Sequence, residues 1–161
     1  MSIHRPPAAP PSPQQDRRRT RPGWRWPLRV VATLLTLLLW TQPLLIGLFL
    51  GGEFDMLAVH AAVGGGLVAI TLLQFFTVIP AWRPGGLPGW VVAAGAAMVV
   101  GAGVQIAAGY QRDLGVHVPL GVALAAAGLS IAVRSWWPTP DPDARQLAAP
   151  LPNPVTPDRS R

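Results

Sequence analysis

The feature that most constrains this chain is a long central region with almost no charge. Of its 13 basic and seven acidic residues, only five lie between residues 30 and 133. A soluble domain carries about 25% charged residues spread over its surface. A soluble globular fold is therefore excluded, and the sequence predicts an all-α membrane protein. The five charged residues are Glu53, Asp55, Arg83, Arg112 and Asp113.

Four apolar segments fill this region, and each approaches the roughly 20 residues that a helix needs to cross the hydrocarbon of a bilayer. The connections between them, GGEFD, PAWRPGGLP and GYQRD, are short and contain the glycines and prolines that end helices. Short connections make consecutive helices antiparallel neighbours. We therefore expect an up-down-up-down bundle of four transmembrane helices within residues 27–137. The segments are residues 30–50, 56–79, 87–108 and 114–133.

Two polar tails flank the predicted bundle. Residues 1–26 and 138–161 are rich in proline, and the first tail is also strongly basic. Proline blocks regular backbone hydrogen bonding and like charges repel, so we expect both tails to be disordered. The first apolar segment is longer than the 7–15 apolar residues of a cleaved signal peptide, and we expect it to be retained.

The distribution of arginine predicts the orientation in the membrane. If both tails and the second connection face the cytoplasm, 12 arginines lie inside and only Arg112 lies outside. Cytoplasmic loops of membrane proteins are enriched in basic residues, so both termini are expected in the cytoplasm. The arginines flank apolar segments, which favours the lipid bilayer as the partner and argues against nucleic acid. Six tryptophans at the cytoplasmic helix ends fit an interfacial aromatic belt: Trp24, Trp26, Trp82, Trp90, Trp136 and Trp137.

Two histidines are the polar groups most able to carry chemistry inside the bundle. His60 is the fifth residue of the second segment and His117 the fourth residue of the fourth. Both segments run inward, so at about 1.5 Å per residue the two rings lie at nearly the same depth near the outer surface. The second and fourth helices of an up-down bundle are diagonal partners. Glycine follows each histidine four residues later, at Gly64 and Gly121, and leaves a slot beside the imidazole for the edge of a porphyrin.

These positions predict that His60 and His117 ligate the iron of a haem b. Neutral imidazole is a good iron ligand, and haem iron can take one ligand on each face of the macrocycle. Gln42 and Gln105, near the outer ends of the first and third segments, would orient an imidazole or the macrocycle edge through hydrogen bonds. Arg112, about one turn above His117, would pair with a propionate. The shared H-x3-G-x2-L spacing suggests an internal repeat of two helix pairs.

Alternative interpretations remain open. The histidines could serve helix packing in a non-enzymatic accessory membrane protein without a cofactor, or they could take part in proton transfer or metal binding. Close helix packing alone explains most of the glycines. A transporter is expected to show charged or broken helices at the midplane, and none is evident. The absence of cysteine excludes disulfides and thiolate metal sites. No enzymatic reaction, redox partner or membrane partner subunit is identified by the sequence.

The segments FDMLAVHAAVGG and GVHVPLGVALAAAGL resemble a family of small bacterial four-helix membrane proteins that carry a domain of unknown function. More distantly, the layout over about residues 30–135 resembles one half of haem A synthase and the bis-histidine membrane cytochromes b. In haem A synthase each four-helix half offers histidines from its second and fourth helices, positions that His60 and His117 match. The resemblance implies a bacterial cytoplasmic membrane location and a haem site. This chain has one such half, lacks the family's cysteine pair, and carries Glu53 in the loop where that family keeps a reactive carboxylate.

Overall fold

The computed structural model describes residues 22–138, which form a bundle of helices. The predicted disordered tails lie almost wholly outside the described residues, at 1–21 and 139–161. All four α-helices are long and apolar enough to cross a membrane, which confirms the prediction of an all-α chain with four candidate membrane spans. The elements are the 3-10 turn η1 (Pro22–Arg25), α2 (Trp26–Leu50), α3 (Met56–Trp82), α4 (Trp90–Tyr110) and α5 (Leu114–Trp136).

All four helices differ from the apolar segments that predicted them: α4 begins at Trp90 and ends at Tyr110 instead of spanning residues 87–108, and the other three extend beyond their segments. Helix α2 begins at Trp26 instead of residue 30 and has Pro27 in its first turn. Proline is tolerated there because a backbone N–H at that position would have no partner within the helix. Helix α3 continues through Pro80 to Trp82, and α5 continues past Arg134 to Trp136. Counting apolar residues finds only the part of a helix inside the hydrocarbon, so these interfacial turns of tryptophan and arginine were missed.

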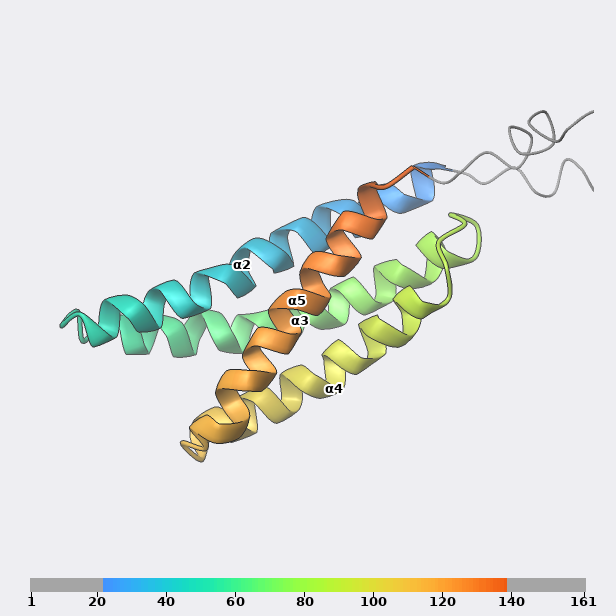
Figure 1. Ribbon diagram of the computed structural model, residues 1–161. Coiled ribbons are helices and arrows are strands. Elements are labelled where there is room, and N and C mark those ends of the chain that lie inside the picture. The colour runs from blue at the N-terminus through green and yellow to red at the C-terminus, as the bar shows by residue number, and fades with distance from the viewer. Residues whose placement is uncertain (1–21, 139–161) are drawn as a thin grey trace, which may run out of the picture.

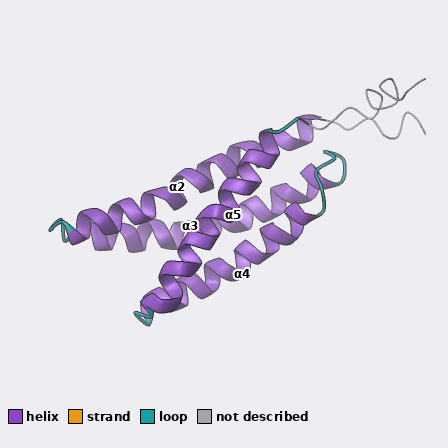
Figure 2. Ribbon diagram, viewed as in Figure 1, coloured by secondary structure: helices purple, strands orange, loops and turns teal. Residues whose placement is uncertain are grey.

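The four helices pack in a closed cycle. Each α-helix packs extensively against two others, in the order α2, α3, α4, α5 and back to α2. Helices α3 and α5, which carry the two histidines, are therefore diagonal to one another. Figures 1 and 2 show that the turns after α2 and α4 lie at one end of the bundle, and that the turn after α3 lies at the other end with the start of α2.

We name the two ends by their charges. The acidic end carries the turns of residues 51–55 and 111–113, with Glu53, Asp55 and Asp113. The arginine end carries η1, the loop of residues 83–89 and the end of α5, with Arg25, Arg29, Arg83 and Arg134. At the acidic end the α2–α3 hairpin and the α4–α5 hairpin separate (Figure 1).

The buried core occupies the middle of the bundle and its arginine end. On α2 no residue beyond Thr36 is buried, on α3 none comes before Leu67, and on α5 none comes before Leu124. On α4 the buried residues also lie at Ala102 or earlier, except Ala108. Apolar side chains therefore fill the bundle from its centre to the arginine end and leave the level of the histidines without a packed core. The largest fully buried side chains are Leu28, Leu35, Gln74, Val78, Val91, Met98, Ile131 and Ser135.

Candidate functional site

The two histidine rings lie next to each other across the bundle. His60 is in the second turn of α3 and His117 is in the first turn of α5. Their ring centroids are 6.1 Å apart, the ring planes are inclined by 60°, and both side chains are half-buried. Residues from diagonal helices thus meet at one depth near the acidic end, as their positions in the sequence predict.

Each ring is oriented by a main-chain carbonyl of the preceding helix. His117 Nδ1 lies 3.0 Å from the carbonyl oxygen of Gln105, and His60 Nδ1 lies 3.4 Å from that of Gln42. A carbonyl oxygen can only accept a hydrogen bond, so in both rings Nδ1 carries the proton and is the donor. In a neutral imidazole Nε2 then holds the free lone pair. Among the described residues neither Nε2 has a hydrogen-bond partner, so both lone pairs are available to a ligand.

The cap of α5 holds His117 in place. The carboxylate of Asp113 accepts a hydrogen bond from the N–H of Val116 at 3.2 Å. The carbonyl of the same aspartate accepts one from the N–H of His117 at 2.9 Å. The first bond satisfies a donor that the first turn of a helix otherwise leaves free, and the second is the first main-chain bond of the helix itself. Sequence reasoning missed this role of Asp113, although an aspartate directly before an apolar helical segment is a recognisable N-cap signal.

The glutamine side chains occupy the space that the glycines leave open. A Cβ added at Gly64 would meet Gln42 Oε1 at 3.7 Å, and one added at Gly121 would meet Gln105 Nε2 at 3.0 Å. The slot expected for a porphyrin edge beside each glycine is thus taken by an amide, because the neighbouring helix brings its glutamine there. The remaining amide atoms, Gln42 Nε2 and Gln105 Oε1, are buried without a hydrogen-bond partner.

The site is built from two equivalent halves. In the first half α2 supplies Gln42 and α3 supplies His60; in the second half α4 supplies Gln105 and α5 supplies His117. In both halves the glutamine amide lies next to the glycine that is four residues after the histidine. The internal repeat suggested by the H-x3-G-x2-L spacing therefore has a counterpart in three-dimensional contacts, with the preceding glutamine as its third member.

One further glycine shapes the second half alone. A Cβ added at Gly109 on α4 would lie 3.1 Å from Cε1 and 3.2 Å from Nδ1 of His117. Contacts this short are tighter than van der Waals distances allow without movement. Gly109 therefore lets the imidazole approach α4 closely enough to reach the carbonyl of Gln105. No motif in the sequence singled out this residue among 17 glycines.

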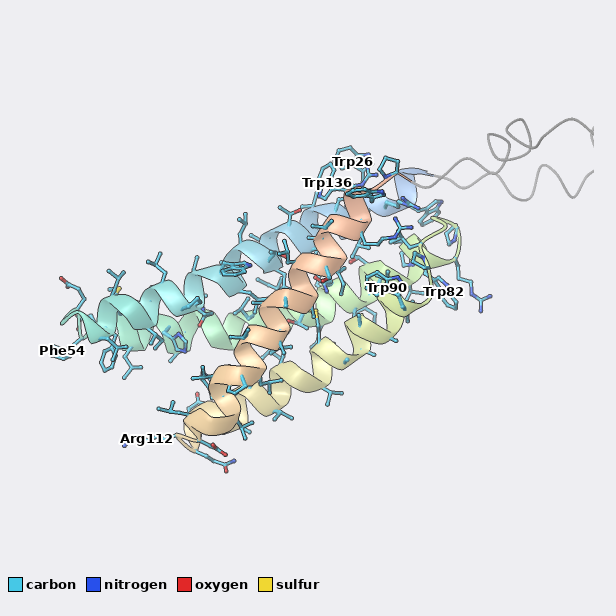
Figure 3. All side chains as sticks on the ribbon, viewed as in Figure 1. Trp26, Phe54, Trp82, Trp90, Arg112 and Trp136 are labelled. Atoms are coloured by element: carbon cyan, nitrogen blue, oxygen red, sulfur yellow. The ribbon has the colours of Figure 1, made fainter. Side chains whose placement is uncertain are left out.

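The charged residues near the histidines are exposed. Arg112 lies in the turn between α4 and α5 with φ of 57°, and Figure 3 places it at the tip of that hairpin, away from Phe54 at the tip of the other. Among the described residues the Arg112 guanidinium has no hydrogen bond or ion pair. Glu53 is also exposed. The structure therefore brings His60, His117, Gln42, Gln105, Gly64 and Gly121 together, and leaves Arg112 at the rim.

Comparisons of the chain with protein-family models, with curated proteins and with solved structures give no match.

Proposed function

We propose that this protein binds one haem b through His60 and His117 in the bacterial cytoplasmic membrane, and that it serves haem-dependent redox or haem handling. The separation of the two rings is the observation that carries the proposal. Two imidazoles that hold the same iron must come from different helices, lie at one depth and approach each other closely. The rings of His60 and His117 are 6.1 Å apart.

The protonation of the rings supports the same assignment. Metal-ligating histidines commonly donate their other ring N–H to a backbone carbonyl, which fixes the tautomer and raises the basicity of the ligating nitrogen. The carbonyls of Gln42 and Gln105 accept from Nδ1 in both histidines. The sequence predicts that the glutamines orient the rings. The main-chain oxygens of Gln42 and Gln105 accept the hydrogen bonds from the rings, and their side-chain amides lie against Gly64 and Gly121.

The number of protein ligands favours haem over a bare metal ion. A zinc site uses three or four protein ligands, and within residues 22–138 no group of three His, Cys, Asp or Glu residues converges. Haem iron needs only the two axial ligands, because the macrocycle supplies the other four nitrogens. The described helices bury few apolar side chains at the acidic end, so a haem there would add apolar contacts that the chain itself lacks. The amides of Gln42 and Gln105 would have to move away from Gly64 and Gly121 to admit it.

We further propose that the four helices cross the membrane in alternating directions, with the arginine end in the cytoplasm. Arg25, Arg29, Arg83 and Arg134 lie at that end, and the acidic residues of the described chain lie at the other. This arrangement follows the positive-inside rule. The histidines then lie near the outer face, where the propionates of the haem reach water and Arg112.

A bound haem would supply one-electron chemistry at its iron. The protein's own residues would do the rest of the work. His60 and His117 would hold the iron, the carbonyls of Gln42 and Gln105 would fix the rings, and Gly109 would keep room for one of them. The apolar helices would exclude water from one side of the site.

The test is the visible absorption spectrum of the full-length protein, purified in detergent from haem-replete cells, with and without reductant. We expect a Soret band and sharp reduced α and β bands, falling below about a tenth of the wild-type intensity in His60→Ala and His117→Ala. His4→Ala, which removes the third histidine of the chain, is the matched control and should retain the bands. A colourless wild-type protein, or bands that survive both substitutions, would favour an accessory protein in which the histidines serve packing.

A further inference from the structure

The arginine end concentrates positive charge that nothing in the described chain neutralises. Four arginines lie there, and the acidic residues among residues 22–138 are all at the opposite end. Arg25 and Arg29 donate to main-chain carbonyls and Arg134 lies in the last turn of α5. Carbonyls and helix C-termini carry only partial negative charge. Burial, together with the nearby positive charges of Arg134 and Arg29, lowers the pKa of the Arg25 guanidinium. A bound anion would offset both effects.

Arg25 is the most deeply buried of these residues. Its side chain is only 3% exposed. Its Nε donates to the carbonyl of Gly85 at 2.8 Å, and its Nη1 donates to the carbonyl of Trp137 at 3.3 Å. Its Nη2 is buried without a hydrogen-bond partner. A buried cationic donor without a partner is costly, and a strong acceptor carrying negative charge is the group that satisfies it best.

Arg134 and Arg29 lie close enough to Arg25 for their charges to act on it. Arg134 Nη1 is also buried without a partner. Arg29 donates from Nε to the carbonyl of Ser135 at 3.0 Å and stacks on two tryptophan rings, 5.3 Å from the Trp26 centroid and 5.0 Å from that of Trp136. Figure 3 shows these two tryptophans side by side where α2 begins and α5 ends. Tryptophans of this kind mark the headgroup level of a membrane protein.

A groove adjoins this cluster and opens between α4 and α5. It has a volume of about 440 Å³, and its walls are mostly apolar. Arg134 belongs to the arginine cluster and also lines the groove. Trp137 lines the groove as well, and its main-chain oxygen accepts the hydrogen bond from Arg25 Nη1. The groove therefore runs from Arg134 along the exposed face of α5. Its lining is Trp90, Leu129, Ser130, Val133, Arg134 and Trp137.

We propose that Arg25, Arg29 and Arg134 bind the phosphate of an acidic glycerophospholipid, with one acyl chain in the groove between α4 and α5. Basic pockets between helices on the cytoplasmic side of a membrane protein suit acidic headgroups. Guanidinium groups bind phosphate through short, charge-assisted hydrogen bonds. The groove distinguishes a lipid from free phosphate, because inorganic phosphate gains nothing from apolar walls. This site is separate from the histidines and does not depend on haem.

The test is native mass spectrometry of the full-length protein in detergent, titrated with dioleoyl phosphatidylglycerol or dioleoyl phosphatidylcholine. We expect the anionic lipid to bind preferentially, and Arg25→Gln and Arg134→Gln to weaken it roughly fivefold each. Arg83→Gln removes the same charge from the same end, at an exposed loop position, and should change the affinity less than about twofold. Equal losses in all three variants, or equal binding of the two lipids, would overturn the specific site.

A second comparison separates the lipid from free phosphate. Ser130→Trp places a large side chain in the groove, whereas Leu73→Trp places one on the exposed face of α3. We expect only Ser130→Trp to weaken phosphatidylglycerol binding, and we expect millimolar inorganic phosphate to compete poorly. If Ser130→Trp has no effect and inorganic phosphate displaces the lipid fully, the site accepts phosphate alone and the lipid assignment is wrong.

Discussion

His117 on α5 donates a hydrogen bond from Nδ1 to the main-chain oxygen of Gln105 on α4 at 3.0 Å. His60 and Gln42 repeat this contact at 3.4 Å between α3 and α2. A main-chain acceptor is insensitive to side-chain substitution, so the tautomer of each ring is fixed by the packing of two helices. The properties of the site should therefore respond most strongly to changes in how closely α4 and α5 approach at the level of the rings.

The first prediction concerns that approach. Gly109→Ala places a Cβ about 3.1 Å from the His117 ring and should displace the ring from the Gln105 carbonyl. Loss of a contact that orients a metal ligand commonly lowers affinity by 10–100-fold, so we expect haem affinity to fall at least about tenfold. Haem titration of the purified variant measures this.

Gly103→Ala is the matched control for that variant. Gly103 is on the same helix, and a Cβ there would meet nothing within 4 Å. Both substitutions raise helix propensity equally, so a general effect on α4 would appear in both. Unchanged haem affinity in Gly109→Ala would contradict the importance of the close approach.

The second prediction concerns a buried glutamine in the core. Gln74 is fully buried; its Nε2 contacts Met98 Sδ at 3.5 Å, and its Oε1 has no hydrogen-bond partner. Gln74→Leu keeps a similar volume and removes an unsatisfied polar group, so we expect stabilisation by about 1–2 kcal/mol. Thermal unfolding in detergent should show a higher midpoint. A lower midpoint would mean that Gln74 has a polar partner in the membrane.

The third prediction concerns the cap of α5. Asp113→Ala removes the acceptor for the Val116 N–H and should destabilise the first turn, which carries His117, by about 1 kcal/mol. Hydrogen exchange should rise at residues 114–117. Glu53→Ala, at an exposed position in the other turn of the acidic end, should leave that exchange unchanged. Faster exchange in both variants would indicate a general charge effect instead.

The fourth prediction concerns orientation in the membrane. The chain has no cysteine, so single introduced cysteines report their side of the membrane without background. A membrane-impermeant maleimide applied to intact spheroplasts should label Glu53→Cys and should label Arg83→Cys only after permeabilisation, following the positive-inside rule. The reverse pattern would place the histidines near the cytoplasmic face and contradict the proposed topology.

The particular residues show what the sequence could and could not predict. The meeting of His60 and His117 followed from their depth in two predicted helices, because helical rise and short turns fix depth closely. The orienting carbonyls, the buried Gln105 amide at Gly121 and the contact of Gly109 depend on the rotation and spacing of neighbouring helices, which no local pattern encodes. The sequence places Arg25 in a tail expected to be disordered, because the prolines and charges around it do not indicate that its side chain is buried against the carbonyls of Gly85 and Trp137.

The most direct test of the central claim is the haem content and spin state of the purified wild-type protein. We expect about one haem b per chain, with ferric and ferrous forms both six-coordinate and low-spin, because both axial positions are imidazole. A five-coordinate, high-spin haem, or a protein that stays free of haem when expressed in haem-replete cells and titrated with haem, would contradict ligation by His60 and His117.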